Sequence, residues 1–191
     1  MAAAVDIHDC TSERWDDVVA VFDGPGDPGR CWCQWFYRGA RADRVSADGN
    51  RAALEAQVRA RPPGVLGYLA GVPSGWCAVA PRHTYTRLVR SKLLAGTPEE
   101  ELADPSVWAV TCFVVRRPAR GRGLAGPLLA GALDLARRGG ARTVEGYPVD
   151  TAERTSTSAA LFPGPLPVFL RAGFTEVARP QPARPVVRVT L

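Results

Sequence analysis

The feature that most constrains the fold of this chain is the apolar run Val107–Val115, in which Thr111 is the only polar residue. A run of this kind is typical of a strand that is buried on both faces of a sheet. A loop rich in glycine and arginine follows it, and apolar residues then recur at helical spacing from Leu124 to Leu135, which predicts a helix. A further strand is expected at Arg142–Val149. Because strand, helix and strand form a crossover unit, two strands of the sheet should be parallel.

The segments on either side of this unit predict further strands and helices, with no internal repeat or low-complexity linker between them. Strands are expected at Val5–Asp9, Val65–Ala70, Trp76–Ala80, Thr175–Val177 and Val186–Thr190, and helices near Ala47–Arg59, Leu88–Leu94 and Val168–Ala172. A first helix is expected to be capped by Thr11 or Ser12 and to end before Gly24. Gly71–Gly75 is expected to be a hairpin-type connection, and the proline-rich Pro180–Pro185 a surface connection. The chain is 46% apolar and 23% charged, which suits a single globular domain over residues 1–191.

The composition disfavours several classes of protein. No apolar run reaches the roughly 20 residues that a membrane helix needs. The first residues lead directly to Asp6 and Asp9, without the basic and apolar regions of a signal peptide, so a cytoplasmic location is expected. The five cysteines are odd in number and scattered, unlike a disulfide framework. Cys31 and Cys33 could form half of a zinc site, but no second pair accompanies them, so no metal is expected.

The charge of the chain leaves two kinds of ligand open. The net charge is +5 and the isoelectric point is near 9.3, with the densest basic cluster at Arg116, Arg117, Arg120 and Arg122. Such a cluster could bind nucleic acid, and it could equally bind a small anionic ligand. Aromatic residues are not interleaved with these arginines, which argues against a nucleic-acid interface.

The loop after Val115 combines glycines with the start of a helix, an arrangement that can hold phosphate. The first N–H groups of a helix lack intrahelical acceptors, and the helix dipole adds positive potential. Gly121 and Gly123 would let the backbone approach a ligand without a Cβ between them. The loop lacks the Walker ending. Gly121–Gly126 fits Gly-x-Gly-x-x-Gly with Glu145 at a plausible offset, but its strand comes too late in the chain for a dinucleotide fingerprint. A plain glycine turn that packs the helix against the strand is the alternative.

Arg120–Ala125 reads Arg-Gly-Arg-Gly-Leu-Ala and resembles the pyrophosphate loop Arg/Gln-x-x-Gly-x-Gly/Ala of the GCN5-related N-acetyltransferases. The order of elements from Trp76 to Val177 is similar to that family, and Val168–Phe174 resembles its short helix closing in Gly-Phe. The resemblance implies an α/β (α+β) fold, with a mixed, mainly antiparallel central sheet, helices on both faces and two central strands splayed apart. It also implies acetyl transfer from acetyl-CoA, as co-substrate, to an amine that the sequence does not identify.

The resemblance assigns the cofactor contacts residue by residue. Backbone N–H groups of Gly121–Gly126 would bind the pyrophosphate of acetyl-CoA. The main chain of Phe113 and Val115, where the family's strand bulges, would pair with the pantetheine arm, and Val114 and Val115 would stabilise the oxyanion. The implied cofactor-binding residues are Phe113, Val114, Val115, Arg120, Gly121, Arg122, Gly123, Leu124, Ala125 and Gly126.

The catalytic side chains are expected on the strand that follows the long helix. Many members of the family carry a tyrosine as proton donor at the position of Phe169, so this chain lacks the usual acid. Tyr147 is the candidate replacement, although a half-buried structural tyrosine fits the pattern equally. Glu145 shares its face of the strand, and Asp150 lies at the end of the strand, so either could be the base. Bound water could also carry the proton.

The aromatic segment 32–37 is expected to border the acceptor, with Trp32, Trp35 and Phe36 as binding residues. The alternative is a hydrophobic plug between the first two helices. His83 could lie at the mouth of the acceptor site, or could simply be solvated. The expected acceptor is a small-molecule or peptide amine, homodimers are common in the family, and no membrane partner is expected. The alternative functions are a CoA-binding sensor without catalysis, suggested by Phe169, and a nucleic-acid-binding module.

Overall fold

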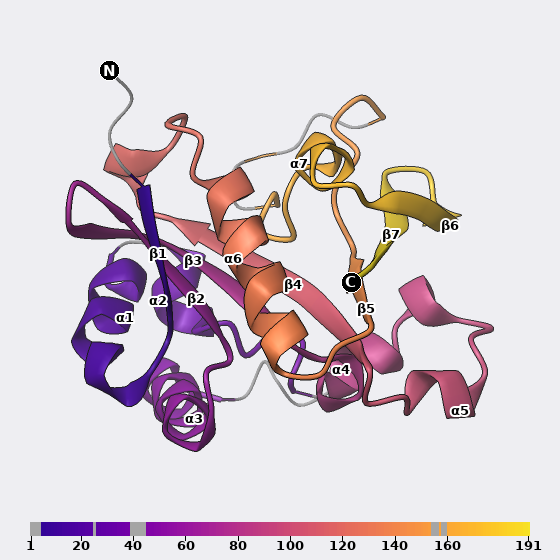
Figure 1. The fold of residues 1–191 in the computed structure, drawn as a ribbon. Coiled ribbons are helices and arrows are strands. Elements are labelled where there is room, and N and C mark those ends of the chain that lie inside the picture. Colours follow the sequence, from indigo (N-terminus) through magenta and orange to yellow (C-terminus); the bar gives the residue numbers. More distant parts are fainter. Residues whose placement is uncertain (1–4, 25, 39–44, 154–156, 158–159) are drawn as a thin grey trace.

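The computed structural model describes residues 5–24, 26–38, 45–153, 157 and 160–191. Its strands form one sheet in the order β1-β2-β3-β4-β5-β7-β6 (Figure 1). The strands are β1 (Val5–Asp9), β2 (Gly64–Leu69), β3 (Val72–Pro81), β4 (Val107–Val115), β5 (Thr143–Gly146), β6 (Thr175–Gln181) and β7 (Arg184–Thr190). The α-helices are α1 (Trp15–Phe22), α2 (Asp27–Cys31), α3 (Ala47–Ala60), α4 (Thr86–Val89), α5 (Glu99–Leu102), α6 (Ala125–Arg138) and α7 (Leu166–Arg171), and the 3₁₀ turns are η1 (Ser12–Arg14), η3 (Arg82–Thr84), η4 (Lys92–Leu94) and η5 (Arg117–Ala119).

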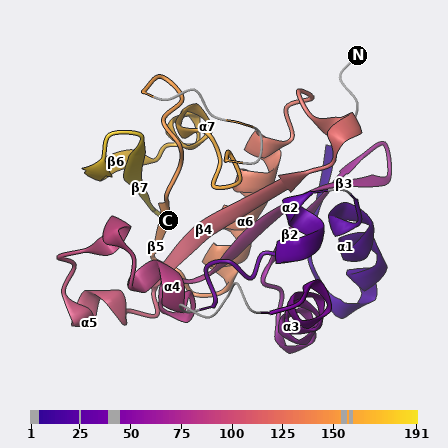
Figure 2. The ribbon, with the colours of Figure 1, turned by 180° about the vertical axis from the view of Figure 1, so that it is seen from behind.

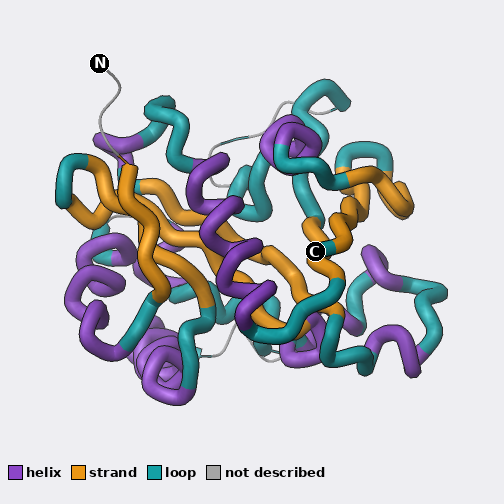
Figure 3. The backbone as a smooth tube through the Cα atoms, viewed as in Figure 1, coloured by secondary structure: helices purple, strands orange, loops and turns teal. Residues whose placement is uncertain are grey.

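β4 and β5 are the parallel pair that the crossover unit predicts, and the other neighbouring strands of the described sheet are antiparallel. The pairing runs from Val107 with Thr143 to Val110 with Gly146, and it ends there. Beyond this point the strands diverge, and the connection from β5 to α7 begins (Figure 3). The mixed, mainly antiparallel sheet with splayed central strands is therefore confirmed. The predicted strand Arg142–Val149 is too long, because β5 leaves β4 after Gly146.

Helices cover both faces of the sheet, as expected. α6 packs across β1, β2, β3 and β4 on one face, and α1 packs on β3 from the other (Figures 1 and 2). Leu128, Leu129 and Ala132 give α6 a completely buried stripe. A Cβ added at Gly131 would come within 2.3 Å of the side chain of Ile7, so the absence of a side chain there lets α6 approach β1 closely. Among the described helices, none is long and apolar enough to cross a membrane.

β4 carries a bulge at Thr111. Val79 pairs with Val110 and Ala78 pairs with Cys112, so Thr111 has no partner residue on β3. A bulge of this kind bends a strand and breaks the regular alternation of its side chains. It lies directly after the last residue that pairs with β5, so the bulge and the divergence of the two strands occur at the same place.

Two predicted connections differ from the structure. The β2–β3 hairpin turns at Ala70 and Gly71, which both have positive φ. β3 therefore begins at Val72, and most of the predicted connection Gly71–Gly75 is strand. Pro180–Pro185 is likewise not a plain connection, because β6 and β7 extend into it from both sides. Proline is compatible with β6, since an edge strand has N–H groups that need no partner in the sheet.

Two predicted helices have different bounds in the structure. Leu88–Leu94 is split into α4 and η4, because the side chain of Ser91 caps the second piece. α7 begins at Leu166, before the predicted start at Val168. Pro167 is tolerated in its first turn, where a backbone N–H would have no intrahelical acceptor.

Candidate functional site

The loop between β4 and α6 is exposed at its glycines. Gly121 and Gly123 have φ values of +73° and +78°, a left-handed conformation that favours glycine. A Cβ added at either residue would meet no atom within 4 Å, and the same holds at Gly126. The loop is therefore not a sealed packing turn, because its glycines face open space in which a ligand could contact the backbone.

The amides of this loop have no acceptor among the described residues. Within the described part of the chain, no N–H group of residues 121–126 donates a hydrogen bond, and Leu128 makes the first intrahelical bond at this end of α6, to the carbonyl of Leu124 (3.0 Å). The dipole of the 14-residue helix adds positive potential at the same place. Five of the six residues 121–126 are exposed or partly exposed, and such a row of amides at a helix start fits a diphosphate group. The buried side chain of Leu124 anchors the loop on the core.

The four loop arginines do not act alike. Arg116 donates to the carbonyl of Pro73 (3.0 Å), and Arg120 donates to the carbonyl of Val115 (3.1 Å), so these two side chains help to fix the loop on the sheet. Arg117 and Arg122 are exposed. Arg120 is exposed as well, so three of the four arginines of the cluster are exposed.

The main chain of β4 presents two amides toward β5. The N–H of Arg116 bonds to the carbonyl of Ser74 on β3 (3.0 Å). Because main-chain groups alternate along an antiparallel edge, the N–H of Val114 also faces β3, whereas those of Phe113 and Val115 face the other way. The N–H of Phe113 does not stay free, since it donates to the carbonyl of Phe162 (2.6 Å). The divergence of β4 and β5 is therefore occupied at this point by the chain itself.

Glu145 and Tyr147 lie together in a buried network of charges. Glu145 is 1% exposed and accepts hydrogen bonds from Arg82 (3.0 Å), the hydroxyl of Tyr147 (2.6 Å) and Arg188 (2.6 and 3.1 Å). Arg188 also pairs with Glu101 (2.9 Å). Burial and the neighbouring carboxylate raise the pKa of Tyr147 well above its usual value, so the hydroxyl stays protonated at neutral pH. The network holds η3, β5 and β7 together and orients both predicted catalytic side chains.

Asp150 follows β5 and belongs to a separate polar group. Its carboxylate pairs with Arg179 (2.9 Å) and accepts the N–H of Ala152 (3.1 Å). The hydrogen bond from Arg179 lowers the pKa of Asp150, so the carboxylate is ionised at neutral pH. A pocket of about 380 Å³ lies here, lined by Asp150, Glu153, Arg179 and Pro182.

Trp32 is part of the core between α1 and α3. It is 6% exposed, its ring stacks on Phe22 (centroids 5.2 Å apart) and Trp15 (6.2 Å), and Arg51 lies over it. Trp32 and the adjacent Cys33 both have positive φ (48° and 52°), a strained conformation for residues with a side chain. Trp32 thus takes the position of a hydrophobic plug, and packing on both sides holds the strained backbone in place.

Trp35, Phe36 and His83 lie in a different region from Trp32. Trp35 is 39% exposed, and the guanidinium of Arg87 lies 3.7 Å from its ring centroid. The N–H of Arg87 donates to the carbonyl of Phe36 (3.0 Å), and exposed His83 lies in the 3₁₀ turn that precedes this segment. The ring of Phe36 lies 6.0 Å from that of Phe162. The structure therefore brings Phe36 close to the divergence of β4 and β5, and places Trp35 beside it.

Phe169, at the position of the family's usual tyrosine, is completely buried. Its ring meets Phe113 and Phe174 edge-on, at centroid distances of 6.0 and 5.1 Å. A Cβ added at Gly146 would come within 2.3 Å of the same ring. The phenylalanine is therefore a packing residue beneath the divergence of β4 and β5.

We expect Phe169→Tyr to lower the melting temperature without raising the rate of acetyl transfer. A buried hydroxyl without a partner costs about 1–3 kcal/mol, which corresponds to roughly 2–12 °C for a domain of this size. Thermal unfolding and thioester consumption by the two proteins measure the effect. A tyrosine variant that is as stable as the wild type and faster would show instead that an acid at this position reaches the site.

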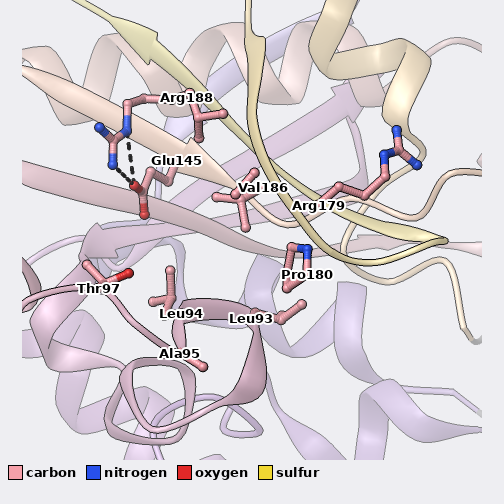
Figure 4. A pocket seen from close by; sticks show the side chains of 11 residues that line it. Leu93, Leu94, Ala95, Thr97, Glu145, Arg179, Pro180, Val186 and Arg188 are labelled. Carbon is pink, nitrogen blue, oxygen red and sulfur yellow. Dashed lines mark hydrogen bonds and ion pairs between the residues drawn. The ribbon is translucent and has the colours of Figure 1, made fainter.

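A pocket of about 430 Å³ lies beside Glu145, between the η4 region and the β6–β7 hairpin (Figure 4). Leu93, Leu94 and Ala95 lie on one side of it, and Val186 and Pro180 on the other. Its lining residues are Leu93, Leu94, Ala95, Thr97, Glu145, Val177, Ala178, Arg179, Pro180, Val186 and Arg188. They include no residue of β4 or of the loop 121–126, so this pocket is separate from the row of free amides.

Cys31 and Cys33, which the sequence disfavoured as half of a zinc site, are neutral thiols in the structure. Burial raises the pKa of Cys31 to about 11, and burial together with neighbouring Cys112 raises that of Cys33 well above its usual value. A metal ligand must be a thiolate, which these environments disfavour at neutral pH. In the part of the chain that the structure describes, no group of three or more histidine, cysteine, aspartate or glutamate side chains is placed to hold a metal ion.

Sequence reasoning missed Phe162, Gly164 and Arg82. Phe162 and Gly164 lie in the long connection between β5 and α7, and a connection of that length inside a compact fold is itself a signal of function. The pattern Pro-Gly-Pro at 163–165 is a second signal, because it fixes a turn. Arg82 gives no local signal, since its partner Glu145 is 63 positions away.

The described strands form a mixed sheet that diverges at a parallel pair, next to amides at a helix start, an α/β arrangement that could hold an anionic ligand. No protein-family model and no curated protein matches the sequence. Solved structures match it along nearly its whole length. The GNAT domain of PAT from S. lividans is 16% identical, with 98% of this chain and 90% of that domain covered and a TM-score of 0.57.

Two further structures show the same likeness. YncA from Salmonella typhimurium, solved with its cofactor acetyl-CoA, is 16% identical, with 98% of this chain and 94% of that chain covered and a TM-score of 0.55. The aminoglycoside acetyltransferase AAC(6')-Ib, solved with coenzyme A, is 14% identical, with 98% and 95% covered and a TM-score of 0.56. This chain therefore has the fold of the GCN5-related N-acetyltransferases, and the resemblance inferred from the loop is confirmed at the level of the fold.

Proposed function

We propose that this protein is an N-acetyltransferase that uses acetyl-CoA and acts on a small-molecule or peptide amine. The observation that supports this most is the row of amides at residues 121–126, which have no acceptor within the described chain. A turn that served packing alone would not need two glycines with positive φ whose Cβ positions open to free space. The fold shared with acetyltransferases solved with acetyl-CoA or coenzyme A supports the choice of ligand.

The loop residues would hold the pyrophosphate. The N–H groups of residues 121–126 would donate to its oxygens, with the N-terminus of α6 behind them. Arg117 and Arg122 are exposed, so they can add charge to the site. Arg116 and Arg120 would act indirectly, because their bonds to Pro73 and Val115 keep the loop in position.

The main chain of β4 would position and polarise the reacting group. Acetyl-CoA supplies an acetyl group that is already activated as a thioester. The amides of Phe113 and Val115 face the divergence of β4 and β5, so they can donate hydrogen bonds to carbonyl oxygens placed there. Val114 faces β3 and would contribute its buried side chain, not its N–H.

The side chains proposed for proton transfer are Tyr147, Glu145 and Asp150. The raised pKa of Tyr147 keeps it protonated, which suits a proton donor. Glu145 already accepts four hydrogen bonds, so its role in transfer would be to orient Tyr147. Asp150 is the more accessible of the two carboxylates and is ionised, which suits a base that acts directly or through water.

Thermal shift and thioester consumption together test the proposed function. Acetyl-CoA is expected to raise the melting temperature, and NADH and ATP far less. A panel of aminoglycosides, polyamines, peptide N-termini and lysine peptides is then screened for release of free CoA thiol. A protein that acetyl-CoA does not stabilise would contradict the proposal at its first step.

A CoA-binding protein without turnover is the second candidate. The buried phenylalanine at position 169, where the family usually carries its proton donor, favours it. Stabilisation by acetyl-CoA with no thiol release from any amine would select this alternative. Nucleic-acid binding is less well supported, because Arg116 and Arg120 are engaged with the main chain.

A further inference from the structure

Residues 161–164, here called the strap, fill the space between the diverging strands. On one side the N–H of Phe113 donates to the carbonyl of Phe162 (2.6 Å). On the other side the N–H of Val149 donates to the carbonyl of Gly164 (2.9 Å), and the N–H of Leu166 returns a bond to the carbonyl of Val149 (2.9 Å). The strap is thus hydrogen-bonded to β4 and to the continuation of β5, and it joins the two where they no longer pair with each other.

The strap also fits closely between the aromatic groups around it. Gly164 has a φ of +90°, and a Cβ added there would come within 2.9 Å of the rings of both Phe113 and Phe169. The half-buried ring of Phe162 lies 6.0 Å from that of Phe36 and packs at the edge of the cluster that contains Tyr147. The strap therefore covers both the amide edge of β4 and the approach from the aromatic region.

We propose that the strap occupies the place of the pantetheine arm of acetyl-CoA. The strap must therefore leave the amide of Phe113 before acetyl-CoA can bind. This rests on the function proposed above, which assigns that amide to the cofactor. One N–H group directed at a carbonyl 2.6 Å away cannot serve a second acceptor at full strength. The carbonyl of Phe162 makes the kind of hydrogen bond that an amide carbonyl of an extended ligand would make. The strap and the ligand therefore compete for the N–H of Phe113.

The strap makes the free protein largely incompetent to bind its cofactor. When a binding-competent state is only a fraction of the molecules, the apparent dissociation constant rises by the inverse of that fraction. Weakening the strap raises the competent fraction, so it tightens binding and speeds association. The ring of Phe162 is the part of the strap that can be removed without touching the predicted cofactor contacts, because the Phe113 amide and the loop 121–126 stay unchanged.

Binding of acetyl-CoA to the wild type, Phe162→Ala and Phe162→Leu tests this proposal by calorimetry and stopped-flow fluorescence. Phe162→Ala is expected to bind about tenfold more tightly, with a faster association step, and Phe162→Leu to lie between it and the wild type. Val72→Ala, which truncates an exposed side chain on the β2–β3 hairpin, is the control and should bind like the wild type. Equal affinities and rates for all four proteins would overturn the proposal for the strap and leave the acetyltransferase proposal intact.

Hydrogen exchange gives a readout that does not depend on turnover. Saturating acetyl-CoA is expected to speed exchange at Val149 and Leu166, whose bonds involve the strap and its anchor, while residues 111–115 become more protected. Binding with unchanged or slower exchange at Val149 and Leu166 would show that the cofactor does not displace the strap. If neither the wild type nor Phe162→Ala binds acetyl-CoA, the proposed function fails, and the strap proposal falls with it.

Discussion

Replacing Gly123 with valine is expected to abolish the rise in melting temperature that acetyl-CoA should give the wild-type protein. Gly123 has a φ of +78°, and its missing Cβ faces the open space above the row of amides. A β-branched side chain would project into the place where the pyrophosphate must approach, and it would strain the backbone by about 1–2 kcal/mol. With ligand at about 100 times its dissociation constant the wild type gains about 2.7 kcal/mol, or roughly 5–10 °C in melting temperature, and the variant should gain almost none.

A matched variant separates the ligand effect from the backbone effect. Gly140 lies just beyond the other end of α6, with a φ of +89° and no atom within 4 Å of an added Cβ. Gly140→Val should therefore lose a similar amount of stability in the free protein and keep the full shift with acetyl-CoA. Differential scanning fluorimetry over an acetyl-CoA titration measures both variants. A normal shift in Gly123→Val would remove the loop from the cofactor site and would sink the proposed function.

Replacing Glu145 with glutamine will produce the largest loss of stability that the structure predicts. The carboxylate is 1% exposed and accepts all of its hydrogen bonds from Arg82, Arg188 and Tyr147. An amide would turn donors toward a guanidinium and leave the charge of Arg82, which is completely buried, without its partner. Removing one member of a buried ion pair costs about 3–5 kcal/mol, so the melting temperature should fall by roughly 6–20 °C.

An exposed ion pair provides the control for this change. Asp134 pairs with Arg137 on the surface of α6 at 2.7 Å, with both side chains more than half exposed (63% and 55%). Asp134→Asn makes the same chemical change and should alter the free energy of unfolding by about 0.5 kcal/mol or less. Urea unfolding of the three proteins measures the difference. A Glu145→Gln variant as stable as Asp134→Asn would mean that the network contributes little, and the buried residues would then need another explanation.

The Glu145 variant also separates a structural role from a role in proton transfer. At a temperature where the variant is folded, an unchanged acetyl-CoA shift with a strongly reduced rate of thioester consumption would support an orienting role toward Tyr147. A rate that falls only in proportion to the folded fraction would assign Glu145 to stability alone. The measurement therefore decides whether the network belongs to the chemistry or to the fold.

The local parts of the molecule could be predicted, because their signals come from neighbouring residues. The strand Val107–Val115 is confirmed at both ends, since a continuous apolar run leaves no other way to bury it. The helix after the loop begins one residue after the predicted start. The divergence of β4 and β5 followed from the family resemblance and is confirmed by the end of their pairing.

The aromatic segment shows where this kind of reasoning fails. Trp32, Trp35 and Phe36 look equivalent in the sequence, yet Trp32 packs between α1 and α3, whereas Phe36 faces Phe162. Nothing within the segment distinguishes them, because the difference depends on the positive φ at Trp32 and on partners from other elements. The burial of each ring is a property of the assembled core and not of the local pattern.

The sequence by itself determined the strand, the glycine loop and the helix that follows it, because apolar periodicity and the conformational freedom of glycine act within a few residues. Only the tertiary structure decided which carbonyl accepts the hydrogen bond of the Phe113 amide and which side chains neutralise Glu145. Phe162 is 49 positions from the first, and Arg82 is 63 positions from the second. Contacts across such separations form only when the whole sheet assembles, so the partner of Phe113 and the partners of Glu145 could not be derived from the linear pattern.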